Sequence, residues 1–145
     1  ENSHVVAALI KKFATAKKNS YPSVTCWGTG EPLREFMHVD DLGDAVVFAL
    51  EKWFPSLNEN SKNTNDDAIY YLNVGTGKDI KIKRLAEIIA TALNYKGEIV
   101  WDTSKPDGTP KKQLDISKIK NLGWKPKIDL IEGITETARS YYSKI

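Results

Sequence analysis

The sequence predicts a mixed α/β fold, in an α/β or α+β arrangement. Amphipathic helical patterns alternate with short runs of β-branched and aromatic residues, and no internal repeat interrupts that order. A chain of 145 residues can bury a single hydrophobic core, and its 41% hydrophobic and 28% charged residues are typical of a globular protein. We therefore expect a single domain.

The chain opens with a predicted helix followed by two predicted strands. Apolar residues recur at helical spacing over residues 5–13, with Ser3 as a candidate cap and lysines toward the far end. Residues 23–27 are rich in β-forming side chains and end at a Gly-Thr-Gly turn. A second short strand is expected over residues 33–39.

A second helix is predicted to begin after two aspartates and to stop near Pro55. Asp40 and Asp41 are expected to be helix-cap and backbone-anchor residues rather than catalytic acids. The polar segment 55–67 has no period and is predicted to be an exposed, disordered or mobile loop. Residues 68–74 then resemble a buried strand that leads into another Gly-Thr-Gly turn.

The rest of the chain is predicted to contain two longer helices, one strand and one short element. Asp129 is the candidate cap of the last helix. The predicted elements are a helix over 82–93, a strand over 98–101, a loop over 103–112, a short element over 114–122 and a helix over 130–142.

Composition excludes several classes of protein. The net charge of +2 comes from 21 basic and 19 acidic residues, so charge alone indicates neither a nucleic-acid nor a membrane partner. A single cysteine, Cys26, excludes an internal disulfide, and two histidines make a zinc cluster improbable. We expect a cytoplasmic protein. The first residues have neither an initiator methionine nor a signal-peptide pattern, so we expect the chain to begin within a longer protein.

Glycine and tyrosine patterns do not indicate a coenzyme site. Neither the turn at 28–30 nor the turn at 75–77 carries the third glycine of a dinucleotide fingerprint. Lys78 is followed by Asp79 rather than Ser or Thr, which excludes a phosphate-binding P-loop. No convincing Tyr-x-x-x-Lys pair is present. Both turns are therefore expected to be strand exits.

Residues 27–41, with the sequence WGTGEPLREFMHVDD, resemble a segment of extended short-chain dehydrogenases that act on nucleotide sugars. In that superfamily the arginine reaches the diphosphate, which implies this role for Arg34. A guanidinium offers a fixed fork of donors that suits paired phosphates better than an ammonium does. The alternative for Arg34 is a surface ion pair.

The opening helix narrows the resemblance to the GDP-L-fucose synthase family. Residues 3–12, SHVVAALIKK, are similar to that family's helix, whose histidine is implicated as an acid in epimerisation. This implies a catalytic role for His4, for which an imidazole pKa near working pH is suited. Without the resemblance, His4 would be interpreted as an exposed polar or cap residue. The remaining implied substrate-binding residues on this helix and the next strand are Val5, Leu9, Lys12, Cys26, Trp27 and Gly28.

Residues 104–112, SKPDGTPKK, resemble the most recognisable loop of the same family. Its prolines stiffen the loop, which lowers the entropic cost of holding cations in place. The resemblance implies that Lys112 reaches the GDP phosphates. The alternative is a solvated lysine-rich turn.

Together these resemblances imply that residues 1–145 form the GDP-sugar-binding, C-terminal portion of an extended short-chain dehydrogenase, without its Rossmann coenzyme core. The family converts GDP-4-keto-6-deoxy-D-mannose to GDP-L-fucose by 3,5-epimerisation and NADPH-dependent reduction, and its members form homodimers. NADP and the Ser, Tyr and Lys of the active centre would belong to a part that precedes residue 1. By itself the chain is expected to be inactive and to bind NADPH poorly.

Three alternatives stay open at this point. Another nucleotide-sugar epimerase or dehydratase would share the segment around Arg34 but should lack the loop from Lys105 to Lys112. A non-catalytic GDP-sugar-binding module would keep the pocket. A nucleic-acid binder is the weakest alternative, because the basic residues are dispersed.

Overall fold

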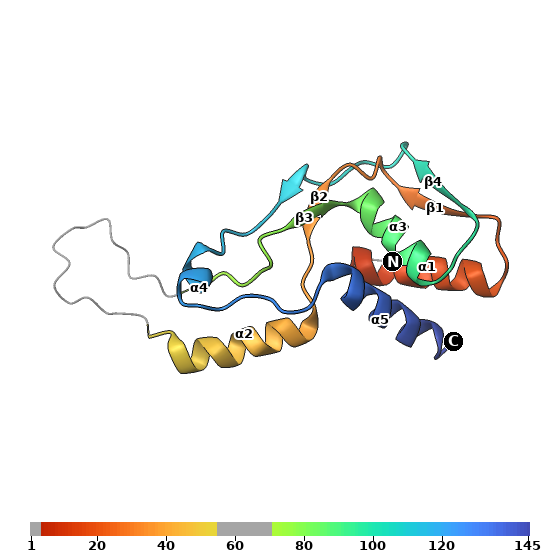
Figure 1. Cartoon of the computed structure of the whole chain (residues 1–145). Helices are drawn as coiled ribbons and strands as arrows, with labels where there is room; N and C mark the ends of the chain where they lie inside the picture. The colour runs from red at the N-terminus through yellow and green to blue at the C-terminus, as the bar shows by residue number, and fades with distance from the viewer. Residues whose placement is uncertain (1–3, 55–70) are drawn as a thin grey trace.

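The computed structural model describes residues 4–54 and 71–145, and the fold is mixed α/β (Figure 1). Three helices pack against one another beside a parallel pair of strands, in which Ser23 lies opposite Glu98. These elements are α1 (Val5–Lys18), α3 (Ile82–Ala92), α5 (Leu130–Tyr142), β1 (Ser23–Trp27) and β4 (Glu98–Asp102).

The main hydrophobic core lies between these helices and the β1–β4 pair. Phe13 of α1 and Leu85 and Ile89 of α3 are completely buried there. Side chains of a strand alternate between its two faces, and β1 accordingly buries Val24 and Cys26 while it exposes Thr25 between them. The same alternation places the next residue, Trp27, on the outer face.

A second sheet of three short strands joins the two ends of the molecule. β2 (Leu33–Glu35) is its central strand. It pairs antiparallel with β3 (Asp79–Lys81) and parallel with β5 (Lys111–Lys112). The parallel pairing places Arg34 directly opposite Lys112.

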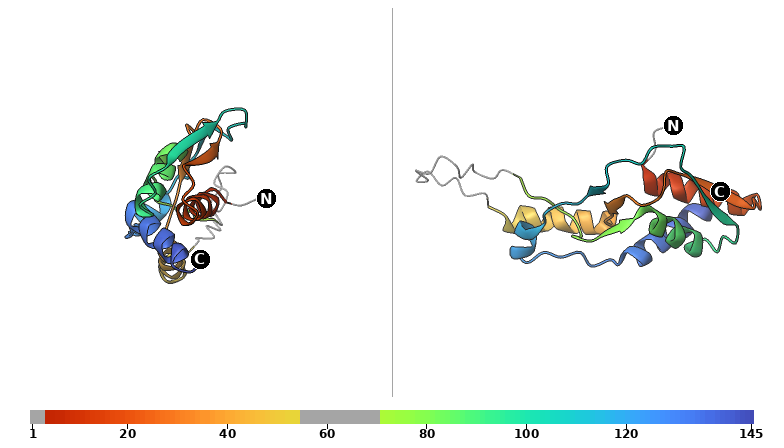
Figure 2. Two further views of the ribbon diagram at one scale, coloured as in Figure 1. Left: turned by 90° about the vertical axis from the view of Figure 1, so that its right-hand side faces the viewer. Right: turned by 90° about the horizontal axis from the view of Figure 1, so that it is seen from above.

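The molecule is elongated, and its second end is built on α2 (Val39–Lys52) and α4 (Ser117–Asn121) (Figure 2). A smaller cluster of Ala45, Ile119 and Trp124 holds this end together. The carboxylate of Asp41, which is 2% exposed, accepts hydrogen bonds of 3.0 Å from the backbone N–H groups of Lys127 and Ile128. The predicted anchoring role of Asp41 is thus confirmed.

Most predicted helices and two predicted strands are confirmed. The helical pattern that begins at Val5 becomes α1, and the patterns over 82–93 and 130–142 become α3 and α5. Asp129 caps α5 as expected, because its carboxylate accepts a hydrogen bond from Ile131 N. The strands expected over 23–27 and 98–101 are β1 and β4.

Three predictions of element limits and caps are wrong. The strand expected over 33–39 ends at Glu35, because the chain then turns into α2. α2 is capped by the imidazole of His38, which accepts from Asp40 N, and not by an aspartate. The predicted loop over 103–112 contains β5.

The prediction of a strand over 68–74 is also wrong for residues 71–74, which are the part of it that the structure describes. Residues 71–74 form no strand; instead Leu72 and Val74 pack on the smaller cluster. A short apolar run has no periodicity that distinguishes a buried strand from a buried irregular segment.

The loop predicted over 55–67, residues 68–70 and the candidate cap Ser3 lie outside the described residues. Within the described part of the chain, no helix is both long and apolar enough to span a bilayer.

Candidate functional site

Trp27 at the end of β1 forms an exposed aromatic surface that has two lysines close to its ring. Its side chain is 66% exposed. The Nζ atom of Lys12 lies 5.6 Å from the centre of its ring, and that of Lys105 lies 5.9 Å away. Lys12 is held there by a hydrogen bond of 2.9 Å from Nζ to the Thr25 carbonyl. The arrangement offers a flat apolar face with positive charge beside it.

The loop after β4 folds back onto the turn that follows Trp27. The carboxylate of Asp107 accepts hydrogen bonds from Thr29 N at 2.9 Å and Thr29 Oγ1 at 2.6 Å. Gly28 has a φ of +77°, and a Cβ at this position would lie 2.2 Å from Asp107 Oδ1. Only glycine therefore fits this contact.

The same loop then runs past Arg34 into β5. Arg34 and Lys112 are register partners, and paired residues of neighbouring strands project to the same side of a sheet. Arg34 Nη1 donates a hydrogen bond of 2.7 Å to the Leu33 carbonyl. Gly108 lies close to the same guanidinium, because a Cβ added to this glycine would be 3.0 Å from Arg34 Nη2. One loop thus connects the surroundings of Trp27 with this pair of cations.

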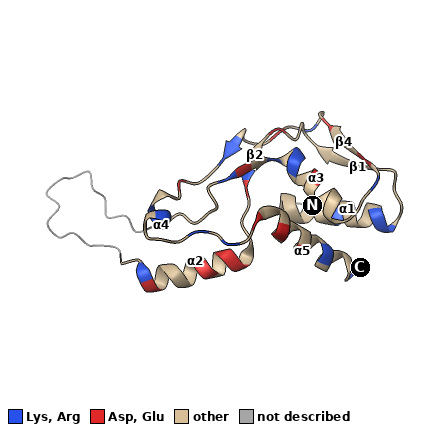
Figure 3. Ribbon diagram, in the orientation of Figure 1, with Lys and Arg blue, Asp and Glu red and all other residues tan. Residues whose placement is uncertain are grey.

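The site is locally positive although the whole chain is nearly neutral. In Figure 3, both residues of β5 are basic, and β5 lies beside β2. Among residues 4–54 and 71–145, no carboxylate forms an ion pair with any of the four site cations, Lys12, Arg34, Lys105 and Lys112. These cations are available to an anionic ligand.

The other predicted site residues do not form an open pocket with Trp27. His4 is exposed at the start of α1, Val5 is half-buried against the main core, and Leu9 is only 5% exposed within it. Cys26 is 2% exposed, and burial raises the pKa of its thiol, an effect that nearby Lys12 partly opposes. Lys12 of α1 lies beside the Trp27 ring, whereas Val5 and Leu9 of the same helix pack with the main core.

Sequence reasoning assigned no individual role to three residues that shape this site. Lys105 and Asp107 belong to the loop whose resemblance was noted, but only the fold shows that they contact Trp27 and Thr29. Glu35 follows Arg34 directly, and its carboxylate binds two other segments. The only sequence signal was membership of these short motifs.

A groove of about 740 Å³ lies elsewhere, where the β2–α2 connection and β3 face α3 and α5. Its lining includes Phe36, His38, Arg84 and Ile134. None of the predicted site residues lines it, so its size alone does not connect it with their chemistry.

Comparison with known proteins finds relatives of this chain. Residues 1–61 match the model of the NAD dependent epimerase/dehydratase family. Over all 145 residues the chain is 46% identical to "Probable GDP-L-fucose synthase 1" of Oryza sativa subsp. japonica, covering 40% of that protein. It is 43% identical over 136 residues to GDP-L-fucose synthase of Escherichia coli (strain K12), covering 94% of this chain and 41% of that one. The chain is homologous to the GDP-L-fucose synthases.

The likeness to GDP-L-fucose synthases extends to three dimensions. A GDP-L-fucose synthetase from Naegleria fowleri, solved with NADP bound, superimposes with a TM-score of 0.78 and 26% identity, over 98% of this chain and 41% of that one. The chain spans about two fifths of the length of these relatives. The similarity therefore covers only that portion of each relative.

The two described glycine turns do not have the geometry of a dinucleotide-binding turn. A coenzyme diphosphate is bound where a glycine-rich turn leads into the N-terminus of a helix. Here the turn at 28–30 leads into β2 and the turn at 75–77 leads into β3. Within residues 4–54 and 71–145, neither glycine turn provides such a site for the coenzyme of a GDP-L-fucose synthase.

Proposed function

We propose that residues 1–145 bind the GDP moiety of a GDP-sugar and form the substrate-binding portion of a GDP-L-fucose synthase. That enzyme would convert GDP-4-keto-6-deoxy-D-mannose to GDP-L-fucose by 3,5-epimerisation and NADPH-dependent reduction. Homodimerisation, a cytoplasmic location and the absence of a nucleic-acid partner stay predictions.

One observation supports the proposal most strongly: a single loop links an exposed indole to the Arg34 and Lys112 pair. A nucleoside diphosphate has a flat base and two charged phosphates, and it would use both parts of this surface. Base stacking suits Trp27. Register pairing places a guanidinium beside an ammonium, which suits neighbouring phosphates.

His4 is the proposed acid of the epimerisation step, on the strength of the family resemblance. Its exposed position at the start of α1 leaves the imidazole free to reach a ligand. Hydride transfer is assigned to polypeptide beyond the residues described here, because neither glycine turn suits NADP.

Titration calorimetry with GDP, UDP and dTDP tests the binding proposal. We expect GDP to bind more tightly than either pyrimidine nucleotide, and Arg34→Lys to weaken GDP binding by about tenfold to a hundredfold, the value of a charge-assisted hydrogen bond. Lys12→Ala should weaken it too. Lys11→Ala, the adjacent exposed lysine of α1, is the matched control. Equal affinity for all three nucleotides would favour another nucleotide-sugar enzyme.

A turnover assay tests the division of the enzyme. We expect the 145-residue chain to show negligible conversion of GDP-4-keto-6-deoxy-D-mannose with NADPH, and little binding of NADPH followed by fluorescence. Robust turnover by the chain alone would contradict this part of the proposal.

A further inference from the structure

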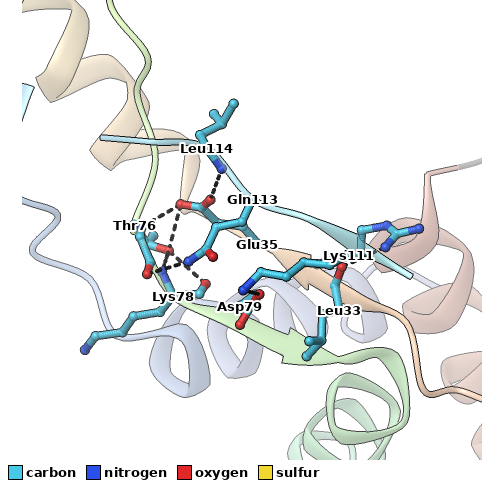
Figure 4. Close-up of polar contacts among 10 residues, drawn as sticks. Leu33, Glu35, Thr76, Lys78, Asp79, Lys111, Gln113 and Leu114 are labelled. Carbon is cyan, nitrogen blue, oxygen red and sulfur yellow. Dashed lines mark hydrogen bonds and ion pairs between the residues drawn. The ribbon is translucent and has the colours of Figure 1, made fainter. Parts of the chain in front are cut away.

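The side chain of Glu35 binds two segments that flank the Arg34 and Lys112 pair (Figure 4). Its Oε1 accepts a hydrogen bond of 2.6 Å from Gly77 N, with Thr76 Oγ1 3.2 Å away. Its Oε2 accepts one of 3.2 Å from Leu114 N, two residues beyond Lys112. One carboxylate of the central strand therefore contacts the turn before β3 and the exit of β5.

The two segments pack closely around the Glu35 carboxylate and are bonded to each other. A Cβ on Gly75 would lie 2.4 Å from Glu35 Oε1, so the turn can approach this closely only without a side chain. Gln113 Nε2 donates to the Gly77 carbonyl at 2.8 Å, which joins the two bound segments to each other. Lys111 adds an ion pair with Asp79 of 3.1 Å across β2.

β5 requires such support. It has only two residues, both exposed, and among the described strands it pairs only with β2. Its parallel pairing is flanked by one hydrogen bond of 2.8 Å from Leu33 N to the Pro110 carbonyl. A pairing this short is marginal in water, because few contacts offset the loss of backbone freedom.

We propose that Glu35 is a positioning residue that keeps Lys112 opposite Arg34 for binding a diphosphate, an inference that rests on the proposed function. Successive side chains of a strand point to opposite faces, so Glu35 projects away from the side that carries Arg34. The carboxylate therefore fixes β5 without neutralising the cations. It acts through Lys112 and does not touch the ligand.

An amide should not replace this carboxylate. The two backbone partners are both N–H donors, one to each carboxylate oxygen. A glutamine has one acceptor oxygen and one donor group, so Glu35→Gln must lose one of these bonds.

The first test is a double-mutant cycle on Glu35 and Lys112 in the full chain, in which calorimetry measures the binding of GDP and of guanosine. We expect Glu35→Gln to weaken GDP binding by about tenfold, a typical coupling between residues of one network, and to leave guanosine binding unchanged. In the Lys112→Ala background, the same change should alter GDP affinity less than about twofold. Asp44→Asn, which alters another anchoring carboxylate that binds Trp124 and Lys127 instead of these segments, is the matched control.

The second measurement does not require a ligand. Amide hydrogen exchange at Gly77 and Leu114 should accelerate in Glu35→Gln and stay unchanged in Asp44→Asn, with thermal unfolding confirming that each variant is folded. Equal losses for GDP and guanosine, equal effects in both Lys112 backgrounds, or unchanged exchange would overturn the inference. A wild-type chain that binds no GDP would instead defeat the proposed function and its extension to diphosphate binding.

Discussion

At the scale of residues, the alternation of β1 assigns opposite roles to two neighbouring side chains. Cys26 faces the core and Trp27 faces outward, although the family resemblance implied that both bind substrate. The inward side chain stabilises the sheet against α1, whereas the outward one contributes little to folding. Their substitutions should therefore affect different properties.

Trp27→Ala should weaken GDP binding by about 5-fold to 150-fold, the value of stacking one base on an aromatic ring, with little change in melting temperature. Calorimetry and thermal unfolding measure the two effects. Phe54→Ala removes an aromatic side chain of similar exposure, 78%, at the end of α2 and should leave affinity unchanged. Unaltered GDP affinity in Trp27→Ala would exclude stacking on this indole.

The thiol of Cys26 should react slowly in the folded protein. Burial favours the neutral thiol and raises its pKa, so little thiolate forms near neutral pH. We expect alkylation by iodoacetamide to be at least about tenfold slower than in denaturing urea. The stabilisation that the neutral thiol provides is complete below its ordinary pKa of 9.0 and is lost as the pH rises through the raised value. Equal rates in both conditions would show that the thiol is accessible.

At the scale of elements, two helices with similar apolar patterns behave differently. α3 buries most of its apolar side, but α2 exposes much of its own. The exposed apolar residues of α2 are Val39, Leu42, Val46, Val47 and Leu50. Periodicity predicts that a helix has an apolar face, but not that other residues cover it.

Leu85→Ala and Leu50→Ala compare these two helices directly. Leu85 is completely buried, so its truncation should lower the free energy of unfolding by about 2–5 kcal/mol. Leu50 is 78% exposed, and its truncation should change that free energy by less than about 0.5 kcal/mol. Urea denaturation of the two variants supplies both values. Similar losses would mean that the outward face of α2 is buried in solution.

At the scale of the whole molecule, Asp41 joins α2 to the segment that leads into α5. The smaller cluster and the main core belong to opposite ends of an elongated chain. Asp41 binds the backbone of Lys127 and Ile128 between these ends. A buried carboxylate that accepts two backbone hydrogen bonds is a specific connection, because each donor would otherwise be unsatisfied.

Asp41→Ala should destabilise the chain by about 2–5 kcal/mol, since it leaves two backbone donors without their partner. Asp40→Ala changes the neighbouring aspartate, whose side chain is 79% exposed, and should cost less than about 1 kcal/mol. Urea unfolding followed by tryptophan fluorescence measures both variants. Equal losses would argue against a special role for Asp41.

The sequence by itself determined the mixed α/β class, the main helices, the β1 and β4 strands and the resemblance to GDP-L-fucose synthases, because periodicity and short motifs are local. Tertiary structure alone decided that Arg34 lies opposite Lys112, that Lys105 reaches Trp27, and that Leu9 is closed within the core. It also created β5, whose two lysines carry no strand pattern and become a strand only beside β2. Such pairings depend on how distant segments pack, and no local spacing specifies them.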